Sequence, residues 1–367
     1  MIRFYLIAVM FIVFFSMACS QEKDSLHFTP VIPSLVTENH EAEGFMVTLE
    51  SGRIIHFFRL EEGIMSDHTG NLGKVVKRIS DNCGENWSDP ITVYDDEFDN
   101  RNVHGGILEN GRIVLFFRRF NSYIQKHADI SMIFSDDDGE TWSERTPVKS
   151  EGESPYGVNL EYLPGKGYLT SFCKNYYLEL KISKDGTNWD STFYKWDYRK
   201  TKEFAFGEAC FTYTGKGRII GLIRDVEKAG ISFFQVFSTD TGKTWSAPQR
   251  TNIANGYFCP SPLIFYNAKR KSVMVVATDR RGFTNDSIYH TGSEIWVYEE
   301  DPEFICQNPD KYKVYTKFKR PIFTNYRFYG YPIFTIDQEG KILIVFTDNN
   351  IRRKMRENAD LYQFTIY

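Results

Sequence analysis

A short polar phrase that ends in tryptophan and occurs four times constrains this chain of 367 residues more than any other feature. The copies occupy residues 80–87, 135–142, 183–189 and 238–245, and their starts are 55, 48 and 55 residues apart (135−80, 183−135 and 238−183). A repeat of about 50 residues is typical of a propeller or a similar array, in which each period forms one supersecondary unit. The sequence therefore predicts a repeated architecture with a common centre, where a ligand would bind.

The chemistry of the phrase indicates a turn that follows a strand. An apolar, β-forming run over residues 130–134 leads into Ser135, and similar runs precede other copies. Within the turn, Asp can accept from backbone N–H groups two residues on, and Gly supplies a positive φ. The acidic run 136–138 also suggests calcium, but an EF-hand loop needs a glutamate at its twelfth position, which is Val148 here. We therefore predict scaffold turns and no metal site.

The four phrases resemble the Asp box, or BNR repeat, of the sialidase superfamily. The resemblance extends over nearly all of the chain that follows the N-terminal leader. In that family the Asp boxes lie on the rim of a propeller and take no part in catalysis. The resemblance therefore implies that these residues are scaffold.

A second pattern predicts how many units the chain contains. Each unit opens with a strand, a polar turn that ends in Gly, and another strand; the turn glycines are Gly52, Gly111, Gly167, Gly217 and Gly340, and the fifth unit lacks one. The expected strand pairs are 45–49 with 54–58, 104–108 with 113–117, 158–163 with 168–172, 209–213 with 219–223, 262–266 with 273–277, and 332–336 with 342–346. Six such units predict an all-β fold, a six-bladed β-propeller over residues 27–367. Residues 27–35 are expected to add the outer strand to the blade formed by residues 361–367, which would remove open edges.

The N-terminus predicts secretion. Arg3 precedes an apolar run over residues 4–15, which is too short to span a bilayer and fits the core of a signal peptide. Residues 16–19 resemble a bacterial lipobox, with Ser16 where Leu is usual, and this implies acylation of Cys19. We predict a signal peptide over 1–18, a tether over 19–26 and a lipoprotein at the outer membrane or cell surface. Ordinary secretion, with Cys19 inside the signal peptide, is the alternative.

The composition of the chain limits the classes of molecule that the protein is expected to bind. The net charge of −4 and the absence of a basic patch argue against nucleic acid. The aromatic content of 16% suits sheets and also sugar sites, where rings stack on sugars. The five cysteines after Cys19 show no metal-binding spacing, and their odd number argues against a full disulfide framework. We expect a monomer with no cofactor, which binds a glycan and meets the membrane through its lipid.

The first strand of each propeller blade lines the central channel, so its entry residues converge on one site. Counting nine residues back from each turn glycine gives Glu43, Asn102, Val158, Glu208 and Tyr331. In the sialidase family a blade-four Glu pairs with a blade-six Tyr, which implies that Tyr331 is the nucleophile and Glu208 its base. A phenol with a pKa near 10 needs such a base at neutral pH. Tyr329 replaces Tyr331 if the register slips by two.

The resemblance also implies a cluster of arginines that grips a substrate carboxylate, because guanidinium binds that group with two parallel hydrogen bonds. Arg224 matches the second arginine of the family, and Arg280 or Arg281 matches the third. The first arginine is missing, since residues 41–43 read Glu-Ala-Glu at its place. This departure weakens the case for sialic acid itself as the substrate.

The remaining candidate site residues are polar groups near the same entry. Asp67 resembles the acid/base of the family, and His68 could serve instead at mildly acid pH. The others are Arg59, Asn102, His104, Tyr156, Asn159 and Glu43 as substrate contacts, with Arg118 and Arg119 as a further source of positive charge or as solvated surface residues. Each alone could be a satisfied interior group, but together they favour a solvated polar pocket.

These observations support three functional hypotheses. The first is an exo-acting glycoside hydrolase that trims an acidic or modified terminal sugar from extracellular glycans. The second is a surface protein that binds glycans without hydrolysing them. The third is a polysaccharide lyase on the same scaffold, with Tyr331 and either His104 or His68 as base and acid. Fold alone does not decide between them.

Overall fold

The computed structural model describes residues 25–62, 72–227, 232–253, 261–279, 294–319, 327–351 and 357–367. These residues form strands and one short helix, α1 (Pro302–Gln307). No helix among them is long and apolar enough to cross a membrane. The fold is therefore all-β, as the sequence predicts.

Four sheets contain four strands each, in chain order. Their strands are β6 (Asp99–Ile107), β7 (Ile113–Asn121), β8 (Lys126–Ser135) and β9 (Thr146–Val148); β10 (Ser154–Leu163), β11 (Gly167–Lys174), β12 (Tyr177–Ser183) and β13 (Thr192–Asp197); β14 (Phe206–Tyr213), β15 (Ile219–Asp225), β16 (Phe234–Ser238) and β17 (Gln249–Arg250); and β18 (Leu263–Asn267), β19 (Ser272–Asp279), β20 (Glu294–Glu300) and β21 (Val314–Lys319).

A fifth sheet contains eight strands in the order β22, β23, β24, β2, β3, β4 and β5, with β1 paired to β24. These strands are β1 (Ile32–Leu35), β2 (His40–Thr48), β3 (Ile54–Glu61), β4 (Lys74–Ser80), β5 (Ile91–Tyr94), β22 (Arg327–Ile336), β23 (Ile342–Ile351) and β24 (Glu357–Ile366). A single parallel pairing, between His40 and Ala359, joins its two halves. We call β2–β5 the first unit, each four-stranded sheet in chain order the second to fifth units, and β22–β24 with β1 the sixth unit.

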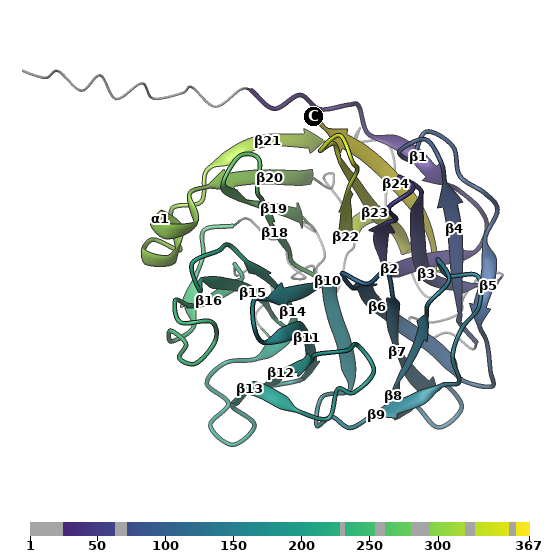
Figure 1. The fold of residues 1–367 in the computed structure, drawn as a ribbon, viewed down its shortest axis with the longest axis horizontal. Helices are drawn as coiled ribbons and strands as arrows, with labels where there is room; N and C mark the ends of the chain where they lie inside the picture. The colour runs from purple at the N-terminus through teal and green to yellow at the C-terminus, as the bar shows by residue number, and fades with distance from the viewer. Residues whose placement is uncertain are drawn as a thin grey trace, which may run out of the picture.

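The sheets gather around a common centre (Figure 1). Their first strands contact one another in chain order, from β2 through β6, β10, β14 and β18 to β22, and β22 contacts β2. The first strands of the six units therefore bring residues from distant parts of the sequence together.

The N-terminal segment closes the sheet of the C-terminal segment, as predicted. Strand β1 pairs antiparallel with β24, with Ile32 opposite Gln363. An isolated bridge between Phe28 and Ile366 extends this pairing. The outer edge of β24 is thereby covered by residues more than 300 positions away in the sequence.

The tryptophan-containing phrases form tight turns that lock each unit onto the one before it. In the second copy the Ser135 hydroxyl accepts from the Gly139 N–H at 2.9 Å. Asp137 accepts from the Thr141 N–H at 2.8 Å, four residues on. In the third copy Asp185 accepts from the Thr187 N–H at 2.9 Å, two residues on, as the sequence predicts. Lys77 of the first unit donates to the Gly139 carbonyl at 2.7 Å. Among the described residues no group of three or more acidic, His or Cys side chains could hold a metal ion.

The turns between first and second strands follow the glycine pattern. Gly111, for example, has a φ of +84°, a conformation that only Gly adopts without steric cost. The fifth unit lacks the glycine, and Lys271 takes that position with a φ of +53°. A side chain in the left-handed region costs roughly 1–2 kcal/mol.

Replacing Lys271 by Gly should therefore stabilise the protein by about 0.5–1 kcal/mol, because relief of the strain exceeds the entropy that Gly loses on folding. Urea unfolding monitored by tryptophan fluorescence measures the change. Lys269→Gly is the matched control, since Lys269 lies in the same turn and has no positive φ. Equal effects of the two substitutions would show that Lys271 is not strained.

Candidate active site

Backbone bulges recur where the first strands enter the centre. The register between first and second strands shifts in five units, between Ala42 and Gly44, Arg101 and His104, Tyr156 and Glu161, Phe206 and Ala209, and Gly330 and Ile333. A bulge adds a residue to one strand and re-aims its side chain, and bulges are common next to active sites.

The bulged positions coincide with the residues found by counting back from the turn glycines. Glu43, Asn102 and Tyr331 have φ values of +53°, +53° and +47°. A residue other than Gly rarely adopts a positive φ, and such strain concentrates at functional sites. Glu208 lies within the fourth bulge, between Phe206 and Ala209. The repeated bulge is thus the structural reason why counting back from the turn glycines finds equivalent positions.

The first and second units are joined by charged groups at their bulges. Glu43 accepts from the Asn102 backbone N–H at 2.5 Å. Its carboxylate also lies 3.6 Å from the Arg101 guanidinium, and both side chains are 7% exposed. The acid that occupies the place of the missing family arginine is therefore held by an arginine of the next unit.

Arg59 lies in a buried ion-pair network. It donates to Asp99 at 2.8 Å and to Glu61 at 2.6 Å, and its side chain is 1% exposed. The carboxylates raise the pKa of Arg59 against the opposing effect of burial, which is the largest single influence. Asp99 also lies 3.6 Å from Arg101. The structure thus places Arg59 among protein carboxylates, and its predicted contact with substrate stays a prediction.

Glu208 and Arg224 contact each other directly. One terminal nitrogen of Arg224 donates to both carboxylate oxygens of Glu208, at 3.0 and 2.8 Å. The two side chains are 14% and 18% exposed, so solvent still reaches the pair. The ion pair fixes the direction in which the Glu208 carboxylate points.

The Tyr156 phenol lies in the electrostatic field of both Glu208 and Tyr331. Burial is the main cause that raises the pKa of the Tyr156 phenol well above its usual value, and the charges of Glu208 and Tyr331 add to it. The phenol also donates to the Pro262 carbonyl at 3.3 Å. Tyr331 is half-buried, and Tyr329 on the same strand is 6% exposed. The structure thus brings the predicted blade-four and blade-six residues within electrostatic reach of one phenol.

His104 lies in the contact between the second and third units. Its side chain is buried, and its Nε2 lies 2.7 Å from the Thr170 hydroxyl of β11. The ring also stacks on Phe116, with centroids 5.8 Å apart. A role of His104 toward substrate stays a prediction.

Several predicted residues fall outside the described parts of the chain. Asp67, His68, Arg280, Arg281 and Cys19 belong to this group. Asn159 lies on β10, but nothing is stated about its side chain. The roles predicted for these residues stay predictions.

Sequence reasoning passed over two residues of this region. Arg101 precedes the bulged Asn102 and meets both Glu43 and Asp99. Cys173 ends the second strand of the third unit, where burial and the charge of Glu208 raise its thiol pKa, while Arg224 and Arg118 oppose the rise. The charges of Arg118 and Arg224, which belong to different units, therefore both act on the Cys173 thiol. Arg101 could have been found as the neighbour of a register position; Cys173 had no sequence signal.

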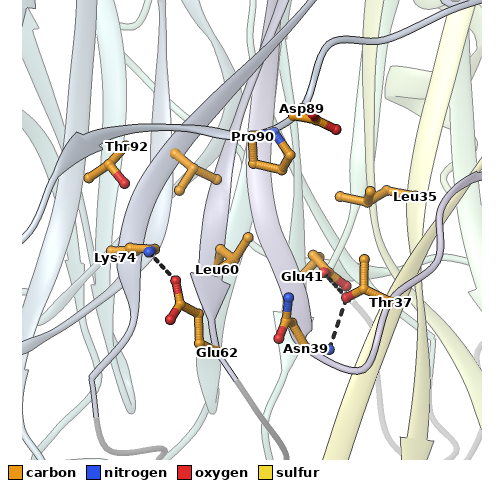
Figure 2. A pocket seen from close by; sticks show the side chains of 11 residues that line it. Leu35, Thr37, Asn39, Glu41, Leu60, Glu62, Lys74, Asp89, Pro90 and Thr92 are labelled. Atoms are coloured by element: carbon orange, nitrogen blue, oxygen red, sulfur yellow. Dashed lines mark hydrogen bonds and ion pairs between the residues drawn. The ribbon is translucent and has the colours of Figure 1, made fainter.

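A cavity of about 460 Å³ lies beside the first unit and is lined by none of the bulge residues (Figure 2). Its lining residues are Leu35, Thr37, Asn39, Glu41, Leu60, Glu62, Lys74, Val76, Asp89, Pro90 and Thr92. Glu41 is 0% exposed and accepts from the Thr37 hydroxyl. Burial raises the pKa of Glu41 to about 7, against the Thr37 hydrogen bond and with a contribution from Asp360. This cavity is separate from the bulge cluster.

Comparison with solved structures shows the same fold in sialidases. A protein of unknown function from Dyadobacter fermentans superposes with a TM-score of 0.71 at 14% identity, covering 94% of this chain and 99% of the other. The NanB sialidase from Streptococcus pneumoniae gives a TM-score of 0.63 at 13% identity, with 91% and 70% coverage. The intramolecular trans-sialidase from Ruminococcus gnavus gives 0.62 at 14% identity, with 90% and 97% coverage. At such identities the likeness shows the fold alone.

No curated protein matches the sequence. Residues 73–344 match the family described as BNR repeat-like domain, and this range includes all four tryptophan-containing phrases. The match covers most of the chain and agrees with the sialidase fold of the structural neighbours. The chain belongs to the BNR repeat-like domain family.

Proposed function

We propose that this protein is an exo-acting glycoside hydrolase of the sialidase type, which removes an acidic or modified terminal sugar from extracellular glycans. Its site lies at the centre of a six-bladed β-propeller whose blades are the six units. Two observations support the blade count: β1 completes the sixth unit, and the first strands contact one another in order. A lipid on Cys19 holds the protein at the outer membrane or cell surface.

The observation that carries this proposal is the bulge shared by the first strands of the fourth and sixth units, which places Glu208, paired with Arg224 at 2.8 Å, and Tyr331, with a φ of +47°, at equivalent positions around the centre. Both residues stand at bulges of first strands, and Tyr331 has a positive φ; such irregularities are common at functional sites. Tyrosine is the nucleophile in sialidases, unlike most glycosidases, which use two carboxylates.

The chemistry proceeds in two steps. The Tyr331 oxygen attacks the anomeric carbon while Glu208 takes the phenol proton, and Asp67 protonates the departing glycosidic oxygen. The second step reverses these roles, because Asp67 then removes a proton from the water that attacks the anomeric carbon and Glu208 returns a proton to the tyrosine. Arg224 positions Glu208, and Arg280 contacts the anionic group of the sugar.

A glycan screen with protein lacking residues 1–23 tests the proposal, with released monosaccharide read by mass. The panel includes a substrate capped by sialic acid and others capped by uronic acids. Release of a free terminal sugar supports the proposal. An unsaturated product that absorbs in the ultraviolet would indicate the lyase instead, and binding without any product would indicate a glycan-binding protein.

A further inference from the structure

Three arginines occupy equivalent places in three units, at the end of the second strand. Arg59, Arg118 and Arg224 each stand seven residues after a turn glycine (59−52, 118−111 and 224−217). Arg59 is matched by two carboxylates within 2.8 Å, and Arg224 by Glu208 at 2.8 Å. Arg118 differs from both, because none of the acids that the structure describes lies that close to it.

The contacts of Arg118 are long. One terminal nitrogen lies 3.4 Å from the Ser154 hydroxyl, and the other lies 3.9 Å from Glu153. Glu153 is engaged elsewhere, since Lys174 lies 2.5 Å from its carboxylate. The Nε of Arg118 is buried and has no hydrogen-bond partner among the residues that the structure describes. A buried donor that is left without an acceptor destabilises the folded state.

Arg118 also faces a like charge. In the pairing of β6 with β7, Arg101 stands directly opposite Arg118. Like charges directly opposite each other on neighbouring strands destabilise a sheet. Burial lowers the pKa of Arg118, and the charge of Arg101 lowers it further, while Glu153 and Glu43 oppose this effect. The protein thus keeps a poorly compensated cation in a half-buried position.

The position of Arg118 relates it to the predicted catalytic pair. Burial raises the pKa of the Cys173 thiol, the charge of Glu208 raises it further, and the charges of Arg224 and Arg118 lower it. The Arg118 guanidinium also lies 3.4 Å from Ser154 at the start of β10, and β10 contacts β14, the strand that carries Glu208. A sugar held at Glu208 can present a substituent toward the second unit.

We propose that Arg118 binds the carboxylate of the terminal sugar and is required for selecting an acidic sugar over a neutral one. The inference rests on the proposed function and deepens it. A carboxylate beside Arg118 would accept from its terminal nitrogens, whose contacts with Ser154 and Glu153 are long, and would offset the repulsion from Arg101. It would also explain how a chain without the first family arginine can still recognise an anion, because the cation comes from the second unit.

Thermal shift and calorimetric titration of the mature protein test this inference. The probes are N-acetylneuraminate, D-glucuronate and D-galacturonate, each compared with its methyl ester, which has the same ring and no charge. At least one acid should bind at least about tenfold more tightly than its ester to the wild-type protein, the value expected for one charged hydrogen bond. Arg118→Met should remove this preference, and Arg118→Lys should restore part of it.

Arg112→Met is the matched control. Arg112 lies at the opposite end of β7, on the rim, where it pairs with Asp136 at 2.6 Å. The control should keep the preference for the acid. Equal binding of acid and ester, binding of no acid, or an unchanged preference in Arg118→Met would overturn the inference.

The design separates this inference from the proposed hydrolysis. Tyr331→Phe should keep the preference for the acid, because it leaves Arg118 in place. Acid-selective binding without any turnover would keep the inference and reject the hydrolase. If the Arg118→Met variant hydrolyses acidic sugars with the same selectivity as the wild type, the hydrolase is supported and the inference about Arg118 is rejected.

Discussion

Tyr331→Phe should reduce turnover of the true substrate by about a thousandfold or more, because it removes the nucleophilic oxygen and nothing else. Glu208→Gln should cause a comparable loss, since the amide cannot accept the phenol proton. Initial rates of sugar release, measured at saturating substrate, give the change in the chemical step. Circular dichroism and the melting temperature establish that both variants fold.

The double variant sharpens this prediction. If Tyr331 and Glu208 act as one unit, the combined substitution should cost little more than either single one, as with residues of a catalytic triad. Tyr329→Phe is the matched control, because Tyr329 lies on the same strand two residues earlier and is 6% exposed. Wild-type rates in Tyr331→Phe together with a large loss in Tyr329→Phe would shift the nucleophile to Tyr329.

Glu41→Gln should change the pH dependence of stability by about 3 kcal/mol. Burial raises the pKa of Glu41 from 4.5 to about 7. The folded protein therefore binds more protons than the unfolded chain within this window, and stability falls as the pH rises from about 4.5 through 7. A difference of about 2.5 pKa units corresponds to about 3 kcal/mol. The variant lacks this loss because glutamine does not ionise.

Urea unfolding at pH 4.5, 6 and 8 measures the effect. The variant should gain stability relative to the wild type as the pH rises, by about 3 kcal/mol over the whole range. Burial also raises the pKa of Glu161 to about 7, so part of the slope remains and only the difference between the two proteins is compared. Glu38→Gln, an exposed substitution in the same connection, is the control. A constant difference between variant and wild type would show that the Glu41 carboxyl ionises as it does in water.

Glu41 lies at the join between the two ends of the chain. Glu41 lies on β2 beside His40, which makes the single parallel pairing with Ala359 of the last strand. Asp360 raises its pKa and Arg78 lowers it, so charges from the first and sixth units meet there. The join between the two ends of the chain should therefore weaken first as the pH rises.

The sequence could predict the strands because their signals are local. Apolar runs on either side of Gly52, Gly111 or Gly340 become β2 with β3, β6 with β7, and β22 with β23. A positive φ needs Gly wherever the chain must turn tightly, so each turn is marked by its own residue. The same spacing found the bulged Glu43, Asn102 and Tyr331, because a repeated unit repeats its irregularities at the same position.

The partners of the charged residues could not be predicted in this way. Arg59 and Arg224 share a register position, yet one is enclosed by Asp99 and Glu61 and the other pairs with Glu208 near solvent. Glu43, which looked like an obstacle to anion binding, is held by Arg101 of the next unit. The pairs Arg59–Asp99 and Glu43–Arg101 depend on which units become neighbours, and the pair Glu208–Arg224 depends on the register within one sheet.

The sequence by itself determined the repeated unit, the turn positions and the family, because each depends on residues close together along the chain. Only the tertiary structure decided which charges neutralise one another at the centre and which, as at Arg118, stay poorly compensated. The physical reason is that electrostatic energy depends on distance in space, and the arrangement of the sheets brings together charges such as Glu43 and Arg101, which stand 58 positions apart in the sequence (101−43).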